Sequence, residues 1–128
     1  MKTTQGKRWN GLLKSGEGAV AALELIKAFS NTKLDMDPND PGLQKSVWTA
    51  TVEAAEKYND PGKFTAFIGY EWTSLDKGNN LHRVVIYRDD ADKTLGQIPA
   101  VTNALSPDPE TLWPQLESYE KNTGGKVL

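Results

Sequence analysis

A glutamate and the only histidine of this sequence are the residues whose types and spacing suit metal chemistry. Glu71 lies in a nearly unbroken apolar and aromatic run from Phe64 to Trp72, and His82 opens the next apolar segment. Such a run predicts a strand that is covered on both faces. An ionised carboxylate in that position needs a cation, a metal or several hydrogen bonds. We therefore expect Glu71 to have a compensating partner, and His82 is the candidate.

The spacing of these two residues predicts that they share one face of a β-hairpin. If residues 64–73 and 81–88 form antiparallel strands around the polar segment 74–80, a register in which the numbers of paired residues sum to 153 places Glu71 directly opposite His82. Cross-strand partners point to the same face with Cβ atoms roughly 4.5–5.5 Å apart, so both side chains can reach one ion. A slip of one residue would send them to opposite faces.

Neighbouring residues bear on whether this pair binds a metal or only forms a salt bridge. Gly69 precedes Glu71 on the same face and predicts open space beside the carboxylate, as a metal or ligand would need. Two donors alone do not make a hydrolytic zinc site, which usually has three protein ligands and an open position. The alternative is a structural ion pair of Glu71 with His82 or Arg83, because such pairs perturb ionisable groups without catalysis.

Helical patterns precede the hairpin. Residues 7–14 and 19–29 predict two short packing helices, and Val20, Leu23 and Ile26 recur near helical spacing as the inward face of the second. Helices followed by a hairpin and a further helix predict an α/β class of fold.

A third helix is predicted over residues 41–58. Asp40 is placed to cap its first turn with Pro41 just inside, and the Asn-Asp-Pro-Gly segment 59–62 ends it. We expect one apolar stripe of this helix to face the core, with Trp48 and Ala55 widening it. The stripe consists of Leu43, Val47, Thr51, Ala54 and Tyr58.

The region after the hairpin predicts a last helix and the beginning of another strand. Asp108 and Pro109 form a helix-start signature, yet Pro114 would then lie in the helix interior, where proline costs about 3 kcal/mol. The alternative start is near Trp113. Tyr119 is predicted to point inward, together with Leu112 and Leu116, and residues 126–128 predict a strand.

Acidic residues elsewhere in the chain are predicted to be solvated. The loop 30–42 carries Asp35, Asp37 and Asp40, but Pro38 and Pro41 interrupt the pattern of alternate oxygen ligands, central glycine and closing glutamate that a helix-loop-helix calcium site needs. Asp89, Asp90 and Asp92 follow the second strand, but their spacing is not diagnostic of a cation site. We therefore leave them out of the candidate site as an exposed acidic loop.

Three segments of the chain resemble a known family. Residues 48–74, 79–83 and 123–128 resemble a bacterial family of uncharacterised proteins, and the resemblance extends from about Gly6 to the end. That family is similar to the polymerase-and-histidinol-phosphatase (PHP) superfamily of metallohydrolases. The resemblance implies a distorted β/α barrel. It also implies that Glu71 bridges divalent metal ions of the zinc, manganese or iron kind and that His82 coordinates one of them.

The departures from the superfamily pattern are as informative as the match. Its Asp-Leu-His-x-His, Asp-His-x-Glu and Pro-His-x-Gly segments are absent, and the chain has 1 histidine. The resemblance therefore implies an incomplete internal slice of a larger metal-dependent hydrolase domain that acts on phosphate- or sulfate-type esters and is inactive alone. Arg83 is a weaker candidate for holding a substrate oxyanion, because it alternates to the opposite face from His82.

A rival interpretation is a non-catalytic protein that holds no metal. A folded remnant or interaction module of this kind would expose unpaired strand edges and apolar surface, which favour self-association.

Composition narrows the classes of partner. With 128 residues, 38% hydrophobic and 25% charged, the chain fits one soluble domain or subdomain. The net charge of -2 gives no field that would attract nucleic acid or anionic lipid. There are no cysteines, and no apolar run approaches the roughly 20 residues of a membrane helix or follows the start as a signal segment. The expected partner is a small ester substrate, with self-association as the alternative.

Overall fold

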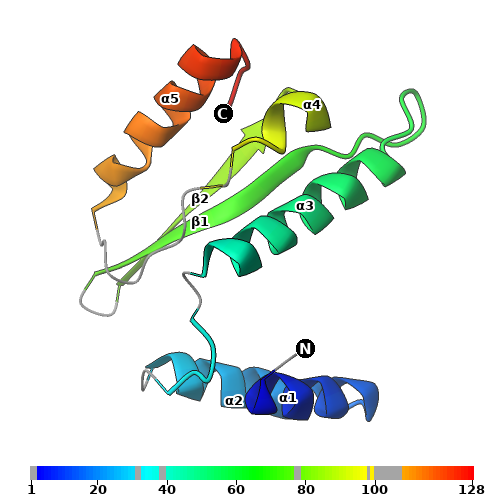
Figure 1. The fold of residues 1–128 in the computed structure, drawn as a ribbon, viewed down its shortest axis with the longest axis vertical. Coiled ribbons are helices and arrows are strands. Elements are labelled where there is room, and N and C mark those ends of the chain that lie inside the picture. Colours follow the sequence, from blue (N-terminus) through cyan, green and yellow to red (C-terminus); the bar gives the residue numbers. More distant parts are fainter. Residues whose placement is uncertain (1–2, 31–32, 38–39, 77–78, 98, 100–107) are drawn as a thin grey trace. The chain divides into compact units, whose positions relative to one another are not determined.

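The computed structural model describes residues 3–30, 33–37, 40–76, 79–97, 99 and 108–128 (Figure 1). The chain divides into two compact units, Met1–Pro38 and Asn39–Leu128. Within the described ranges it contains five α-helices, one short 3-10 helix and one two-stranded antiparallel sheet. The predicted order of helices, hairpin and C-terminal helix is confirmed, and the class is mixed helix and strand. These residues form no barrel.

The first unit is a pair of helices, α1 (Thr4–Lys14) and α2 (Gly18–Ser30). Thr3 caps α1 by accepting the Gly6 N–H at 3.1 Å. Trp9 of α1 is buried against Ala21 and Ala28 of α2. The prediction that Val20, Leu23 and Ile26 point inward is wrong, because all three are exposed. The buried face of α2 presents small side chains to the Trp9 ring.

The second unit begins with helix α3 (Pro41–Tyr58), whose predicted bounds and cap are confirmed. The Asp40 carboxylate accepts the Leu43 N–H at 2.7 Å, and Asn59 ends the helix. The predicted inward stripe is wrong, since Leu43, Thr51, Tyr58 and its other members are exposed. The inward face is formed by Trp48, Val52 and Ala55, which are spaced four and three residues apart.

The strands β1 (Ile68–Asp76) and β2 (Asn79–Tyr87) pair antiparallel over their whole length. The predicted register is wrong by two residues: Glu71 lies opposite Val84, and His82 lies opposite Thr73. The strands continue to Asp76 and from Asn79, which face each other, so the numbers of paired residues sum to 155 and not to the assumed 153. An even shift keeps every side chain on its predicted face.

The strand predicted at the end of the chain is also confirmed as a short pairing. Leu128 and Ile86 exchange backbone hydrogen bonds of 2.9 and 2.7 Å, and the Arg88 N–H donates to the Lys126 carbonyl at 3.0 Å. Val127 forms an antiparallel bridge with Tyr87. This segment therefore covers one end of the free edge of β2.

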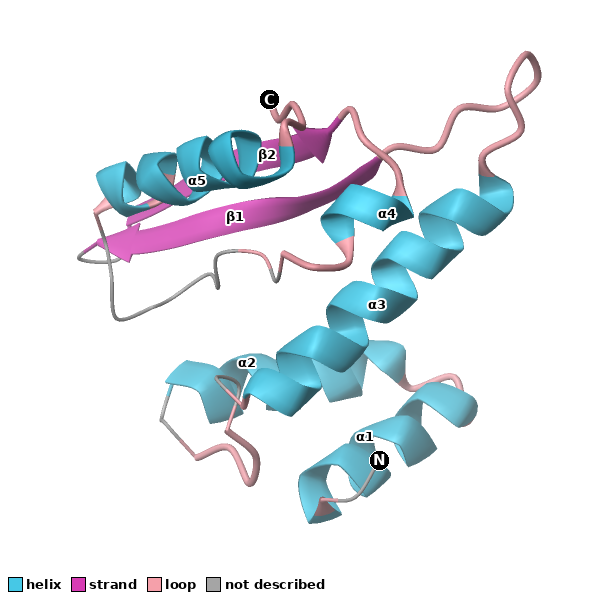
Figure 2. Ribbon diagram, turned by 45° about the horizontal axis from the view of Figure 1, so that its top comes forward, coloured by secondary structure: helices cyan, strands magenta, loops and turns pink. Residues whose placement is uncertain are grey.

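The remaining elements are α4 (Ala91–Thr94), the 3-10 helix η1 (Pro109–Thr111) and α5 (Trp113–Thr123). The alternative start of the last helix near Trp113 is confirmed, so Pro114 lies in its first turn, where it removes no helical hydrogen bond. Helix α5 runs alongside the hairpin (Figure 2).

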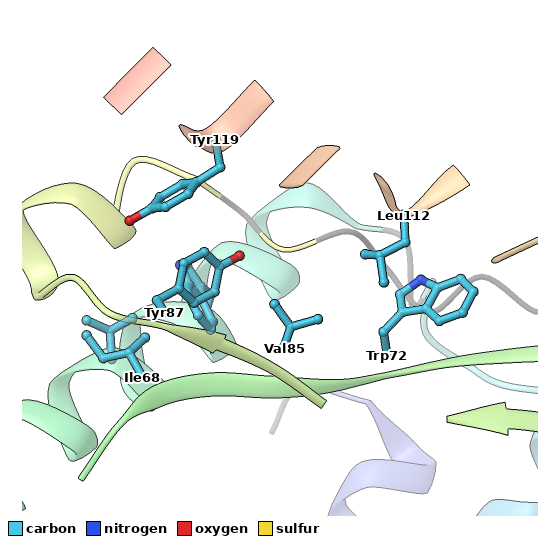
Figure 3. Packing of buried hydrophobic residues seen from close by; sticks show 8 residues of the cluster. Ile68, Trp72, Val85, Tyr87, Leu112 and Tyr119 are labelled. Carbon is cyan, nitrogen blue, oxygen red and sulfur yellow. The ribbon is translucent and has the colours of Figure 1, made fainter. Parts of the chain in front are cut away.

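The core of the second unit lies on one face of the hairpin. Figure 3 shows side chains of both strands pointing toward Leu112 and Tyr119. Trp48 of α3 joins the same cluster, and its indole N–H donates to the Thr94 carbonyl at 2.8 Å. The strand residues of this hydrophobic cluster are Ile68, Trp72, Val85 and Tyr87.

Among the described helices, none is both long and apolar enough to span a membrane.

Candidate functional site

The candidate site lies on the outer face of the hairpin, opposite the core. Along β1, Glu71 and Thr73 alternate with the buried Trp72 and Ser74. Along β2, His82 and Val84 lie on the same outer face as Glu71 and Thr73. The Glu71 side chain is 63% exposed and that of His82 is 49% exposed. The prediction that β1 is covered on both faces is therefore wrong for this chain, and Glu71 lies where its charge is solvated at little cost.

Three polar side chains meet on this face. A 2.8 Å hydrogen bond links Thr73 Oγ1 to His82 Nδ1, and Glu71 Oε1 lies 3.5 Å from the same nitrogen. The expectation that Glu71 and His82 lie close together on one face of adjacent strands is thus met, as diagonal instead of direct neighbours. Thr73 was missed, because the assumed register gave its place opposite His82 to Glu71.

The geometry accommodates both alternatives drawn from the sequence. A separation of 3.5 Å between Glu71 Oε1 and His82 Nδ1 is an ion pair when the imidazole is protonated. It is also short enough for both atoms to contact one cation. An exposed ion pair contributes roughly 0–1 kcal/mol of stability, so this pair is not needed to hold the hairpin together.

Gly69 does not provide the open space predicted beside Glu71. A Cβ at this position would stand 2.5 Å from the Val85 carbonyl oxygen and 3.5 Å from the Ile86 Cα. Gly69 therefore permits close approach of the β2 backbone, which is a structural role.

Arg83 alternates to the opposite side of the strand from His82, as predicted. Its guanidinium donates to the His82 carbonyl oxygen at 2.9 Å. This contact places the Arg83 charge beside the backbone of β2, away from the Thr73–His82 hydrogen bond.

The prediction that Asp89 belongs to an exposed acidic loop is wrong. Its side chain is only 7% exposed, and its carboxylate accepts hydrogen bonds from the Tyr119 hydroxyl, the Lys126 N–H and the Lys93 ammonium. Burial raises the pKa of Asp89, but these three donors outweigh it and lower the pKa below its ordinary value. Burial and the same contact raise the pKa of Tyr119 to about 12. Asp89 is thus a structural anion.

Asp90 and Asp35 also form hydrogen bonds. Asp90 caps α4 by accepting the Asp92 N–H at 3.3 Å. In the first unit, Asp35 and Gln5 each accept the backbone N–H of the other, at 2.7 and 2.9 Å. Within the part of the chain that the structure describes, no three His, Cys, Asp or Glu side chains are grouped so as to hold a metal ion.

A cavity of about 330 Å³ lies on the core side of the hairpin. Its walls include Tyr70 and Tyr87 from the inner face of the sheet and Gln115 and Leu116 from α5. It is therefore separated from Glu71, Thr73 and His82 by the sheet itself.

Comparison with known proteins gives a family and no function. No curated protein and no solved structure matches the chain. The profile of the family described as "Protein of unknown function (DUF3604)" matches residues 1–128. Because this match covers the whole sequence, the chain belongs to the DUF3604 family.

Proposed function

We propose that this chain supplies Glu71 and His82 to the divalent-metal site of a hydrolase that acts on phosphate- or sulfate-type esters. The observation that supports the proposal is the 3.5 Å separation of Glu71 Oε1 and His82 Nδ1 on an exposed face of the hairpin. Carboxylate and imidazole are donors that zinc, manganese and iron accept, and an exposed site leaves room for a substrate. The PHP-like barrel that the resemblance implies belongs to this proposal.

The donor set fits a metal only in part. Glu71 and His82 are two donors, whereas a catalytic site usually takes three from the protein and keeps a position open. In the proposed enzyme, Glu71 and His82 would both hold metal, Glu71 as the bridging carboxylate that the resemblance implies, and further ligands would have to come from outside this pair. The bound metal would lower the pKa of a water molecule and polarise the ester. Arg83 stays outside this site because it alternates to the other face.

Metal titration of the chain tests this proposal. We expect isothermal titration with Mn²⁺ or Zn²⁺ to show weak, saturable binding that is lost in both Glu71→Gln and His82→Ala. Glu53→Gln is the matched control, because Glu53 is an exposed glutamate on α3, outside the site. Binding that is unchanged in His82→Ala, or lost equally in Glu53→Gln, would reject the assignment.

The rival function, a self-associating module without catalysis, is favoured by a different observation. Val84 is 68% exposed on the outer face, and no described strand pairs with the second edge of β1. Such edges and apolar patches favour association between copies. Sedimentation of the chain and of Val84→Lys separates the two functions: a dimer abolished by the lysine, without metal binding, would favour the module.

A further inference from the structure

Thr73 occupies the position directly opposite His82 in the sheet register. Its hydroxyl oxygen and the Glu71 carboxylate oxygen approach the same imidazole nitrogen, Nδ1, at 2.8 and 3.5 Å. The negative charge of the cluster thus lies on the Nδ1 side of the ring. A cation bound by both Glu71 and His82 with little movement of either side chain would therefore lie near Nδ1, within reach of Thr73.

We propose that Thr73 Oγ1 is a third protein donor for the divalent cation, and that His82 binds this cation through Nδ1. This inference rests on the proposed function and specifies its donor set. Neighbouring ligands at about 2.1 Å from one ion lie about 3.0 Å apart in octahedral and about 3.4 Å apart in tetrahedral coordination. The observed separations of 2.8 and 3.5 Å from Nδ1 lie close to these values.

The donor types indicate the class of cation. One imidazole nitrogen, one carboxylate oxygen and one neutral hydroxyl oxygen form a mixed nitrogen and oxygen set without sulfur. Such a set suits Mn²⁺, Fe²⁺ or Zn²⁺, whereas thiolate-rich sites select softer metals. The cation would take the place of the hydrogen bond between Thr73 Oγ1 and His82 Nδ1: the hydroxyl keeps its proton and turns it away from the ring, and the imidazole carries its proton on Nε2, so that both atoms present lone pairs to the ion.

Substitution of Thr73 separates a donor role from a passive one. Thr73→Val keeps the branched shape that suits a strand and removes the hydroxyl, and Thr73→Ser keeps the hydroxyl. We expect Mn²⁺ affinity, measured by the loss of the free-ion EPR signal, to fall on the order of tenfold or more in Thr73→Val. It should stay near wild type in Thr73→Ser and in the control Thr51→Val, which alters an exposed threonine of α3. Circular dichroism verifies that each variant is folded.

The single histidine allows a direct test of which nitrogen binds. Because the chain has 1 histidine, protein labelled with ¹⁵N in the imidazole gives one Nδ1 and one Nε2 resonance. Titration with diamagnetic Zn²⁺ should shift Nδ1 as the coordinated nitrogen and leave the proton on Nε2. Coordination at Nε2 would overturn the inference, since Thr73 would then only orient the ring through Nδ1.

The outcomes also separate this inference from the proposed function. Binding that needs Glu71 and His82 but is unaffected by Thr73→Val would reject only the third donor. A complete lack of saturable binding by the wild-type chain would reject both.

Discussion

The Tyr119 hydroxyl donates a 3.0 Å hydrogen bond to Asp89 Oδ2. This bond links α5 to the segment that leaves β2, because Asp89 lies two residues after the end of that strand. The same oxygen accepts the Lys126 N–H at 2.6 Å, so one carboxylate joins the hairpin end, the last helix and the closing segment. Three of the predictions below concern this unit's stability, and the fourth concerns catalysis.

The stability of the chain should depend on the ionisation of Asp89. Its folded-state pKa lies below the ordinary value of 3.8, so its contribution is fully present above that pH. The contribution is lost as the pH falls below 3.8 and through the lower folded-state pKa. Urea unfolding at pH 7 should show Asp89→Asn to be less stable than wild type by about 1–3 kcal/mol. The difference should shrink as the pH is lowered to about 3.

The control for this prediction is Asp92→Asn, which changes an exposed aspartate of α4. It should leave the pH dependence of unfolding close to that of wild type. Equal pH dependence in the wild type and Asp89→Asn would contradict the structural role of Asp89.

Gly125→Ala should destabilise the second unit. A Cβ at this position would stand 2.7 Å from Tyr119 Cε1 and 2.8 Å from Thr123 Oγ1, and it would collide with Asp89 Oδ2. We expect a loss of about 1–3 kcal/mol, seen as a lower Tm by differential scanning calorimetry. Gly96→Ala is the matched control, because nothing lies within 4 Å of its added Cβ. A Tm for Gly125→Ala equal to that of the control would refute the close packing.

Trp48→Phe should cost more than its lost apolar area. The variant removes the indole N–H that donates to the Thr94 carbonyl at 2.8 Å in a buried residue, and this carbonyl then keeps only the Gln97 N–H, which donates to it at 3.1 Å. Loss of one buried hydrogen bond costs about 0.5–1.5 kcal/mol beyond the lost apolar area, measurable by urea unfolding. Trp113→Phe, at an exposed indole, should change the free energy of unfolding by less than about 0.5 kcal/mol.

The chain alone should not hydrolyse phosphate or sulfate monoesters. Glu71, Thr73 and His82 give one charged and two neutral donors on an exposed surface, which is too little to hold an ion firmly and activate water. Assays with chromogenic phosphate and sulfate esters, supplied with Mn²⁺ or Zn²⁺, should give the same rate for wild type and His82→Ala. Robust turnover that His82→Ala abolishes would mean that this chain contains a complete site.

Features set by neighbouring residues were predicted well from the sequence. Asp40 and Pro41 define the start of α3 because capping and proline geometry act within one turn. The shared face of Glu71 and His82 follows from strand alternation, which survives an even error in register.

Features set by distant partners were not predicted. The inward face of α3 depends on Trp48 reaching Thr94, which is 46 residues away in the sequence. The burial of Asp89 depends on Tyr119 and Lys126, at sequence separations of 30 and 37. No local pattern around Asp89 distinguishes it from a solvated aspartate.

The two faces of the hairpin share a backbone but have separate tasks. Side chains such as Trp72 and Val85 fill the core, whereas Glu71, Thr73 and His82 contribute little to holding it together. Substitutions on the outer face are therefore nearly neutral for folding, as exposed positions generally are. During evolution, the polar residues of the outer face can therefore be gained, lost or replaced while the apolar residues of the inner face stay the same. Each sequence along such a path would still fold.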